Sequence, residues 1–469
     1  MHGWRMIASD SHSGFPDDDP RLWPLHDDSS NRFPPQQDEV AVSAQPSDGE
    51  EMFPPVTRSQ WRERAGSETS PGALSTREDR PVGVPLGGRY SRGWLRIAAL
   101  HGDASDAESV LSQGSEGLEL SWSAGCFDGL AEVKPTTPIV MRSHGDGLAV
   151  LDAFGMCSGI LHMGFDPLGS LARDGYESPE WDGYLQQVPG VVQAGAQRQP
   201  SGRALRLDTG SWQGAGANLS LDLAAGITNL LETLRAAEAG GVGPDAVASQ
   251  LVVAVAVGPD IMEEIARLRA LRVLIERVMR AAGVASPAPA WIHARGALST
   301  HSLLDPMTNA LRATDQTIAG VLGGADAITT AAFDALADEP GSMGARLARN
   351  TQSVLAFESH LARVADPAAG SYHLERRTEE LARSAWEHVR VIEERGGAAA
   401  CLLDGWWHDQ LDAIWKQTRE SFEEGEAHVL GASQHPGEDV LSTGMAATHG
   451  PDRAIRPLPL RRPAELFES

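Results

Sequence analysis

The sequence has few cysteines and no long apolar run. Its three cysteines, Cys126, Cys157 and Cys401, stand far apart and form no Cys-x-x-Cys pair. Neither a disulfide framework nor a zinc knuckle is therefore indicated, and a reducing, intracellular setting is expected. No apolar stretch approaches the roughly 20 residues that a membrane helix requires, and the first 30 residues are acidic and proline-rich, unlike a signal peptide. The sequence predicts a cytoplasmic protein without a membrane segment.

The sequence also has few basic residues relative to acidic ones. The 469 residues contain 39 Lys and Arg against 64 Asp and Glu, which gives a formal net charge of -25. Such a surface repels nucleic acid and anionic lipid, so neither is expected as a partner. No GxGxxG or GxxxxGK[ST] motif follows the first predicted strand, which removes the main reason to prefer an open, nucleotide-binding sheet.

Residues 1–90 contain several acidic, proline-rich stretches and few periodic apolar positions. A segment of this kind cannot bury enough apolar surface to offset its chain entropy, so we interpret it as a long N-terminal arm, largely disordered or extended. Within it, Phe53 to Ala65 has Thr57 as an N-cap and contains Trp61. This pattern predicts a short helix, either docked on another surface or transient in a disordered tail.

Residues 91–400 alternate between short apolar runs and helical segments, which is typical of a parallel sheet with crossover helices. Runs such as LVVAVAV are apolar on both faces, as strands between a barrel interior and an outer helix layer must be. The pattern predicts a (β/α)8 TIM barrel. The predicted strands begin at Gly117, Pro138, Gly159, Ala204, Leu251, Ala288 and Ala325, with an eighth, SYHLE, at Ser371.

The helices between these strands carry clear end signals. Asp260, with Glu263 three residues later, forms a capping-box pattern, and Gly283 closes the same helix. Its apolar residues repeat on one face, which we expect to point inward. Residues 401–469 are predicted to form a C-terminal helical extension followed by an extended linker that contains PLPLRRP.

Several long motifs identify a family. LARNTQSVLAFESHLARVADPAAGSYHLE, LDPMTNALRATDQTIAGVLGGADAITTAAFDA and IARLRALRVL together resemble the barrel domain of methylmalonyl-CoA mutase. The likeness is strong over about residues 200–400 and weaker over 50–200. It implies that the helix containing Arg349 to Gln352 lies between the seventh and eighth barrel units.

The same joint can be interpreted from its residues alone. Asn350 and Thr351 are poor choices inside a helix, so their side chains need partners. Asp366 and Pro367 end the helix, and Gly370 permits a positive φ that would let Tyr372 return to the barrel as a strand. We expect this joint to be barrel architecture rather than active-site chemistry.

The resemblance implies either a catalytic chain or a silent partner, and the residues favour the partner. The DxHxxG loop, whose His ligates cobalt in the catalytic chain, is absent; DSHSG at Asp10 has the wrong spacing. The C-terminal sequence resembles the connector into a cobalamin domain that this chain lacks. GSWQGAGA, from Gly210 to Ala217, has lost the His and Glu of the catalytic motif. Gln250 stands where the catalytic chain usually has Arg, so we expect no cation for an acyl-CoA carboxylate.

His293 is the one candidate catalytic residue. It precedes Asp305 by twelve residues, the spacing at which the catalytic chain holds a His that hydrogen-bonds the thioester carbonyl. At the end of a barrel strand, a neutral imidazole could polarise a carbonyl. The sequence after it differs from the catalytic pattern, so His293 is otherwise a relic or a satisfied structural histidine. His144, His162 and His301 have no ligand spacing, and no metal-binding or cofactor-binding residue is predicted.

Three functions follow from these observations. The first is a methylmalonyl-CoA mutase small-subunit-like barrel, non-catalytic alone, which forms a heterodimer with the catalytic large subunit and wraps it with its N-terminal arm. That catalytic chain interconverts (R)-methylmalonyl-CoA and succinyl-CoA in propionate metabolism. The second is an acyl-CoA-binding isomerase barrel that is active with a separately encoded cobalamin-binding subunit. The third is a free-standing barrel with an unrelated activity. Adenosylcobalamin is expected in the family complex but not on this chain alone.

Overall fold

The computed structural model describes residues 93–100, 104–123, 125–142, 147–155, 157, 159–175, 183–284, 287, 289–363, 366–442 and 456–468. The predicted N-terminal arm, its helix at Phe53 to Ala65, and His144 lie outside these residues.

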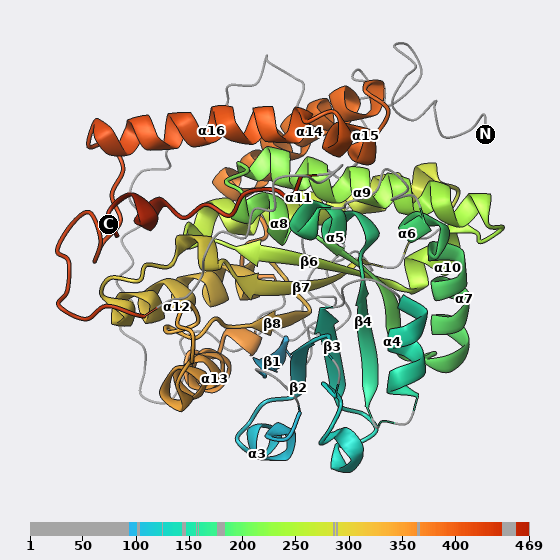
Figure 1. Cartoon of the computed structure of the whole chain (residues 1–469), viewed down its shortest axis with the longest axis horizontal. Helices are drawn as coiled ribbons and strands as arrows, with labels where there is room; N and C mark the ends of the chain where they lie inside the picture. Colours follow the sequence, from blue (N-terminus) through green and yellow to red (C-terminus); the bar gives the residue numbers. More distant parts are fainter. Residues whose placement is uncertain are drawn as a thin grey trace, which may run out of the picture.

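Eight parallel strands close into a barrel in the order β1 to β8, which confirms the predicted (β/α)8 fold (Figure 1). The closure is made by β1, in which Leu95 pairs with Ala327 of β8 and Ile97 with Gly117 of β2. The strands are β1 Leu95–Ala99, β2 Gly117–Ser121, β3 Pro138–Arg142, β4 Ile160–Phe165, β5 Arg203–Asp208, β6 Leu251–Val257, β7 Trp291–Gly296 and β8 Ala327–Thr329.

Seven of the predicted strands coincide with β2 to β8, but the eighth was wrong. Tyr372 begins a 23-residue helix, α14 (Tyr372–Glu394), and β1 was not predicted. Gly370 does have a positive φ, of 77°, but it leads into this helix. SYHLE alone is too short for its periodicity to separate strand from helix. Consequently, the helix with Arg349 to Gln352, α13 (Ser342–Phe357), follows β8 rather than lying between the seventh and eighth units.

Outer helices follow the strands around the barrel. The longer ones are α4 Gly147–Phe154, α5 Pro167–Asp174, α7 Val188–Arg198, α9 Leu219–Ala239, α11 Ile261–Ala281, α12 Pro306–Leu322, α13, α14 and α16 Trp406–Glu423. The short ones are α3 Ala107–Ser112, α6 Gly183–Gln186, α8 Gly210–Gly214, α10 Pro244–Ser249 and α15 Ala398–Leu403, with 3-10 turns η1 Leu130–Glu132, η2 Leu298–Thr300, η3 Leu361–Arg363 and η4 Pro463–Leu466. None of the described helices has the length and apolarity needed to cross a bilayer.

Helix α11 begins where its capping pattern predicts, since Asp260 Oδ1 accepts a hydrogen bond from the Glu263 N–H at 3.3 Å. Its predicted inward stripe is buried from Ile265 to Val278. Three arginines of the same helix are also buried. Arg267 pairs with Asp222 of α9 and Glu264, Arg269 with Asp366 and Glu375, and Arg272 with Asp326. Buried charges persist only when paired, so these bonds fix α11 against its neighbours.

The C-terminal part of the chain forms an outer layer and then returns to the barrel. Helices α14, α15 and α16 lie over α9 and α11 (Figure 1). Residues 456–468 then run across the loops that follow the strands. The Leu458 N–H donates to the Ala172 carbonyl at 2.7 Å, the Arg461 N–H to Gly214 at 2.8 Å, and Arg462 Nη1 to His301 at 3.1 Å. The predicted extended linker is therefore held against the carboxyl-terminal rim of the barrel.

Candidate functional site in the barrel bore

The interior of the barrel is here called the bore. Its amino-terminal half is filled with apolar side chains. Alternate strand residues point inward, and those at the start of the strands form a buried cluster of their own. Its indole and aliphatic side chains meet across the barrel axis, as the interior layers of a TIM barrel do. The cluster consists of Leu95, Ile97, Val140, Val252, Trp291 and Ala327.

The carboxyl-terminal half of the bore holds a network of charged side chains. Arg295 of β7 donates from Nη2 to both carboxylate oxygens of Asp208 at 2.8 Å. Arg206, two residues before Asp208 on β5, donates from Nε to the same carboxylate at 3.1 Å. Glu119 of β2 lies 3.7 Å from Arg295 Nη1 and 3.3 Å from Arg142 Nε. Four strands, β2, β3, β5 and β7, therefore meet through ion pairs inside the barrel.

These surroundings keep the two carboxylates ionised. Burial alone would raise the pKa of Glu119, but the adjacent His293, Arg142 and Arg295 outweigh it and lower the pKa to about 2. Burial likewise opposes ionisation of Asp208, yet Arg295 and Arg206 hold the pKa of its carboxyl well below the usual range. The network is thus a set of fixed charges at pH 7, not a group poised to exchange a proton.

His293 lies inside this network and is completely buried. Its Nδ1 is 3.4 Å from Arg206 Nη1, and its Nε2 is 2.8 Å from Thr329 Oγ1. A guanidinium can only donate, so Nδ1 accepts, and Nε2 carries the proton that is donated to Thr329. Burial lowers the pKa of His293 to about 3, which leaves the ring neutral at pH 7. Both ring nitrogens are engaged by the protein itself.

The other histidines singled out in the sequence are separate from this network. His162 of β4 stacks on Trp291 with ring centroids 4.5 Å apart. His301 is fully buried near the C-terminal segment, and burial lowers its pKa to about 4. Among the residues that the structure describes, no group of three or more His, Cys, Asp or Glu side chains could hold a metal ion.

Sequence analysis did not find Glu119, Arg206, Asp208 or Arg295. The signal that could have indicated them is a pair of ionisable residues two positions apart in an otherwise apolar strand. Such residues lie on the same face of the strand and can interact there. This pattern occurs twice, at Arg206 with Asp208 in RALRLD and at His293 with Arg295 in WIHARG. The bore therefore contains arginines at positions other than Gln250, and each already has a carboxylate partner.

Comparison with known proteins identifies the chain's relatives. The model of the methylmalonyl-CoA mutase family matches residues 163–449, from β4 to beyond α16. The chain belongs to the methylmalonyl-CoA mutase family. Proteins named as small subunits are similar over most of its length. The methylmalonyl-CoA mutase small subunit of Streptomyces virginiae is 32% identical over 369 residues, covering 76% of this chain and 58% of the relative.

Two further relatives extend the comparison. The probable methylmalonyl-CoA mutase small subunit of Mycobacterium tuberculosis is 30% identical over 380 residues, covering 78% of this chain and 57% of that protein. The methylmalonyl-CoA mutase large subunit of Porphyromonas gingivalis is 27% identical over 261 residues, which is 55% of this chain and 36% of the relative. The chain thus spans a little more than half the length of these small subunits.

The mutase-family motif in α13 closes the barrel. Gln352 accepts a hydrogen bond from the Trp94 indole at 3.1 Å and donates to the Ile97 carbonyl at 3.2 Å. Thr351 finds the partner that its helical position requires, the Leu347 carbonyl, at 3.0 Å. The motif therefore ties the last barrel helix to the segment that contains the first strand.

Mutase chemistry in this family is generally cobalamin-dependent, and the described residues do not fit a corrinoid. A corrinoid would need an accessible imidazole or an open flat surface beside the bore. Among the described residues, His293 of β7 and His301 in the segment after it are both completely buried, so neither offers an accessible imidazole. In addition, residues 456–468 cross the rim that such a ring would face. Gln250 is also buried, at the start of β6 and away from this rim.

Proposed function

We propose that this chain is the non-catalytic barrel partner in a cytoplasmic, heterodimeric methylmalonyl-CoA mutase. In this proposal a separate catalytic chain interconverts (R)-methylmalonyl-CoA and succinyl-CoA with adenosylcobalamin. The observation that carries the proposal is the occupied bore, in which charged side chains fill the carboxyl-terminal half and apolar ones the other half.

An acyl-CoA could enter this bore only by displacing paired charges. Moving Arg295 aside would strip Asp208 of its closest partner and leave Arg206 to neutralise it alone. Breaking one buried ion pair costs on the order of 3–5 kcal/mol. Below this layer, a pantetheine arm would also meet Trp291, which stacks on His162. The chain's own side chains thus oppose the path that a thioester substrate would take.

In this proposal His293 is a positioning residue within the network. The neutral imidazole accepts a hydrogen bond from Arg206 and donates one to Thr329 of β8. It therefore links the arginine to β8 without adding a charge. The ring has no free nitrogen with which to polarise a substrate carbonyl. Its resemblance to the catalytic histidine would then reflect shared ancestry of the strand.

The test compares the full chain alone with the chain co-expressed with a catalytic mutase chain from the same organism. Alone, we expect no succinyl-CoA from methylmalonyl-CoA with added adenosylcobalamin, no corrinoid absorbance and no heat of acyl-CoA binding. Together, we expect a 1:1 complex that turns over substrate. Turnover by this chain mixed only with a free cobalamin-binding domain would refute the proposal and favour a split enzyme.

A further inference from the structure

Two outer helices expose large apolar side chains to solvent. Leu311 is 64% exposed and Phe357 62% exposed, which is far more than a buried helix face permits. On α13, the exposed apolar residues are Met343, Val354 and Phe357. They are spaced by eleven and three positions, so they lie along one side of the helix. We call these residues the α12–α13 face: Met307 and Leu311 of α12, and Met343, Val354 and Phe357 of α13.

The α12–α13 face is continuous with a neighbouring loop. The two helices contact each other and lie side by side at the lower left of Figure 1. Arg312 of α12 donates to the Leu430 carbonyl at 2.5 Å, and Val440 forms a β-bridge with Leu304 just before α12. Leu430 and Val440 are themselves exposed. Two helices about 25 Å long, packed side by side, present about 500 Å², which is most of the roughly 800 Å² that one partner buries in a standard interface.

Helix α13, one of the two helices of this face, carries positive charge although the whole chain is acidic. Helix α13 contains Arg346 and Arg349 and no Asp, Glu or Lys, although the whole chain carries a net charge of -25. Neither arginine forms an ion pair within the described part of the chain, and Arg349 donates only to the Gln113 amide. Burial and the nearby Arg346 lower the pKa of Arg349. Helix α13 thus offers two positive charges that have no counter-ion among the residues the structure describes.

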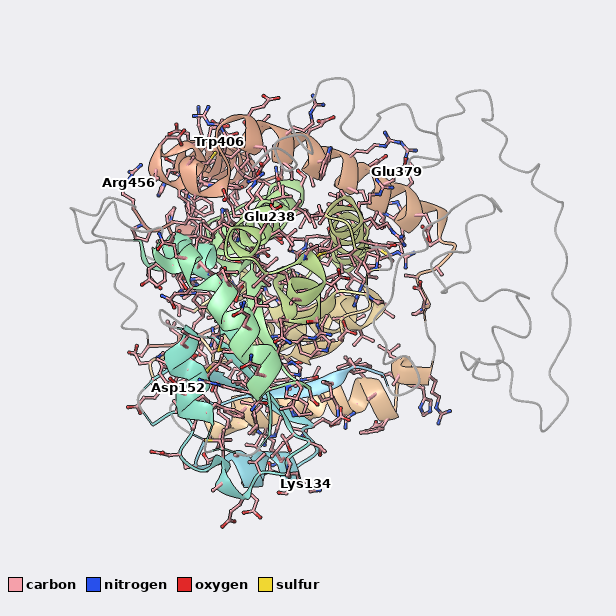
Figure 2. The ribbon with its side chains drawn as sticks, turned by 90° about the vertical axis from the view of Figure 1, so that its right-hand side faces the viewer. Lys134, Asp152, Glu238, Glu379, Trp406 and Arg456 are labelled. Atoms are coloured by element: carbon pink, nitrogen blue, oxygen red, sulfur yellow. The ribbon has the colours of Figure 1, made fainter. Side chains whose placement is uncertain are left out.

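The outer layer formed by α14 and α16 is rich in charged residues. Figure 2 shows Glu379 of α14 and Trp406 at the start of α16 on the outer helical layer. Charged residues of these helices pair in turn along each helix, as in Arg376–Glu380, Arg383–Glu379, Lys416–Glu420 and Arg419–Glu423. Such pairs suit a helix that faces water. By contrast, Met, Phe and Arg without Asp, Glu or Lys are typical of the core of a protein interface.

We propose that the α12–α13 face is the surface through which this chain binds the catalytic mutase chain, and that the catalytic chain meets it with apolar side chains flanked by carboxylates. This assignment rests on the proposed heterodimer. A second copy of this chain fits less well, because a symmetric contact would bring Arg346 and Arg349 of one copy towards the same residues of the other.

The proposal is tested by placing a photoreactive side chain on the face in the full-length complex. Leu311→p-benzoylphenylalanine and Phe357→p-benzoylphenylalanine should each cross-link to the catalytic chain, and the linked peptides should be acidic or apolar by mass spectrometry. Arg419→p-benzoylphenylalanine on α16 is the matched control and should not cross-link. Links from positions 311 and 357 to this chain's own N-terminal segment, or to a second copy, would overturn the assignment.

A second measurement uses charge and needs no buried substitution. Arg346→Glu with Arg349→Glu should raise the dissociation constant of the complex at least tenfold at 0.15 M salt, and the difference should shrink at 0.5 M salt because salt screens exposed charges. Arg419→Glu should leave it unchanged. If the unmodified chains bind and the double variant binds equally well, the surface assignment fails while the heterodimer stands. If the unmodified chains do not bind, the proposed function itself fails.

Discussion

Arg295 and Asp208 join β7 to β5 inside the barrel, across β6, through two contacts of 2.8 Å from one guanidinium nitrogen. The strand between them makes room, because its inward residues Ala254 and Ala256 are small. Arg206 adds a second cation to the same carboxylate. One ion pair thus spans three strands and fills part of the carboxyl-terminal half of the bore.

Replacing Asp208 with Asn should destabilise the barrel strongly. The variant keeps the size of the side chain but leaves Arg206 and Arg295 buried without their shared counter-ion. We expect the free energy of unfolding in urea to fall by about 3 kcal/mol. Glu423→Gln, which breaks an exposed pair with Arg419 on α16, is the control and should leave stability unchanged. A loss below about 1 kcal/mol in Asp208→Asn would show that the network does not hold the bore closed.

The pH dependence of stability should carry the signature of His293. Burial lowers its native pKa to about 3, whereas an unfolded histidine titrates near 6.5. Between these values the unfolded chain binds a proton that the native state does not, so stability falls as pH decreases from about 6.5 towards 3. His293→Gln should reduce this slope by about 1.4 kcal/mol per pH unit. Equal slopes in the two proteins, from urea unfolding at pH 4.5 to 6.5, would contradict a neutral buried ring.

The same substitution separates structure from catalysis. Gln can accept from Arg206 and donate to Thr329 as the imidazole does, so His293→Gln should fold. In the proposed heterodimer, we expect its kcat and KM for methylmalonyl-CoA to match those of the unmodified complex within about twofold, because both ring nitrogens are engaged by Arg206 and Thr329. A loss of kcat of about a hundredfold or more, the size expected of an acid or base, would restore His293 as a catalytic residue.

The joint between α13 and β1 should be sensitive at Gln352 and tolerant two residues earlier. Gln352→Leu leaves the Trp94 indole and the Ile97 carbonyl without their partners, and each buried unsatisfied group costs about 1–3 kcal/mol. We expect a loss of about 3 kcal/mol in the free energy of unfolding. Asn350→Ala, at an exposed position of the same helix, should be neutral or slightly stabilising. Equal stability of the two variants would mean that the motif does not close the barrel.

Sequence patterns predicted most of the barrel because its strands are short apolar runs between turns. LVVAVAV could hardly be anything but a buried strand, and Asp260 capped its helix as expected. The ends of the barrel were harder to predict. LRIAA is five residues long and contains Arg96, while SYHLE is the first turn of α14, whose helical repeat shows only over its later residues.

The bore network could not be predicted as a network. The sequence shows that Arg206 and Asp208 share one side of β5, but their contact with Arg295 depends on the register and closure of the whole barrel. In the same way, the expectation from Gln250 concerned one position only, and the placement of Arg206 and Arg295 across the bore cannot be read along a single strand. The family motifs predicted the fold well since they recur in order, but they gave no information on what fills the interior.

Helix α11 shows how the position of an outer helix along the barrel is fixed by specific contacts. An apolar helix face tolerates a small translation or rotation of the helix, because one aliphatic contact can replace another. Arg267, Arg269 and Arg272 allow no such exchange, since each reaches a different neighbour: α9, the turn into α14, and the start of β8. A shift by a single residue would separate all three arginines from their carboxylate partners at once, so this helix can pack in only one register.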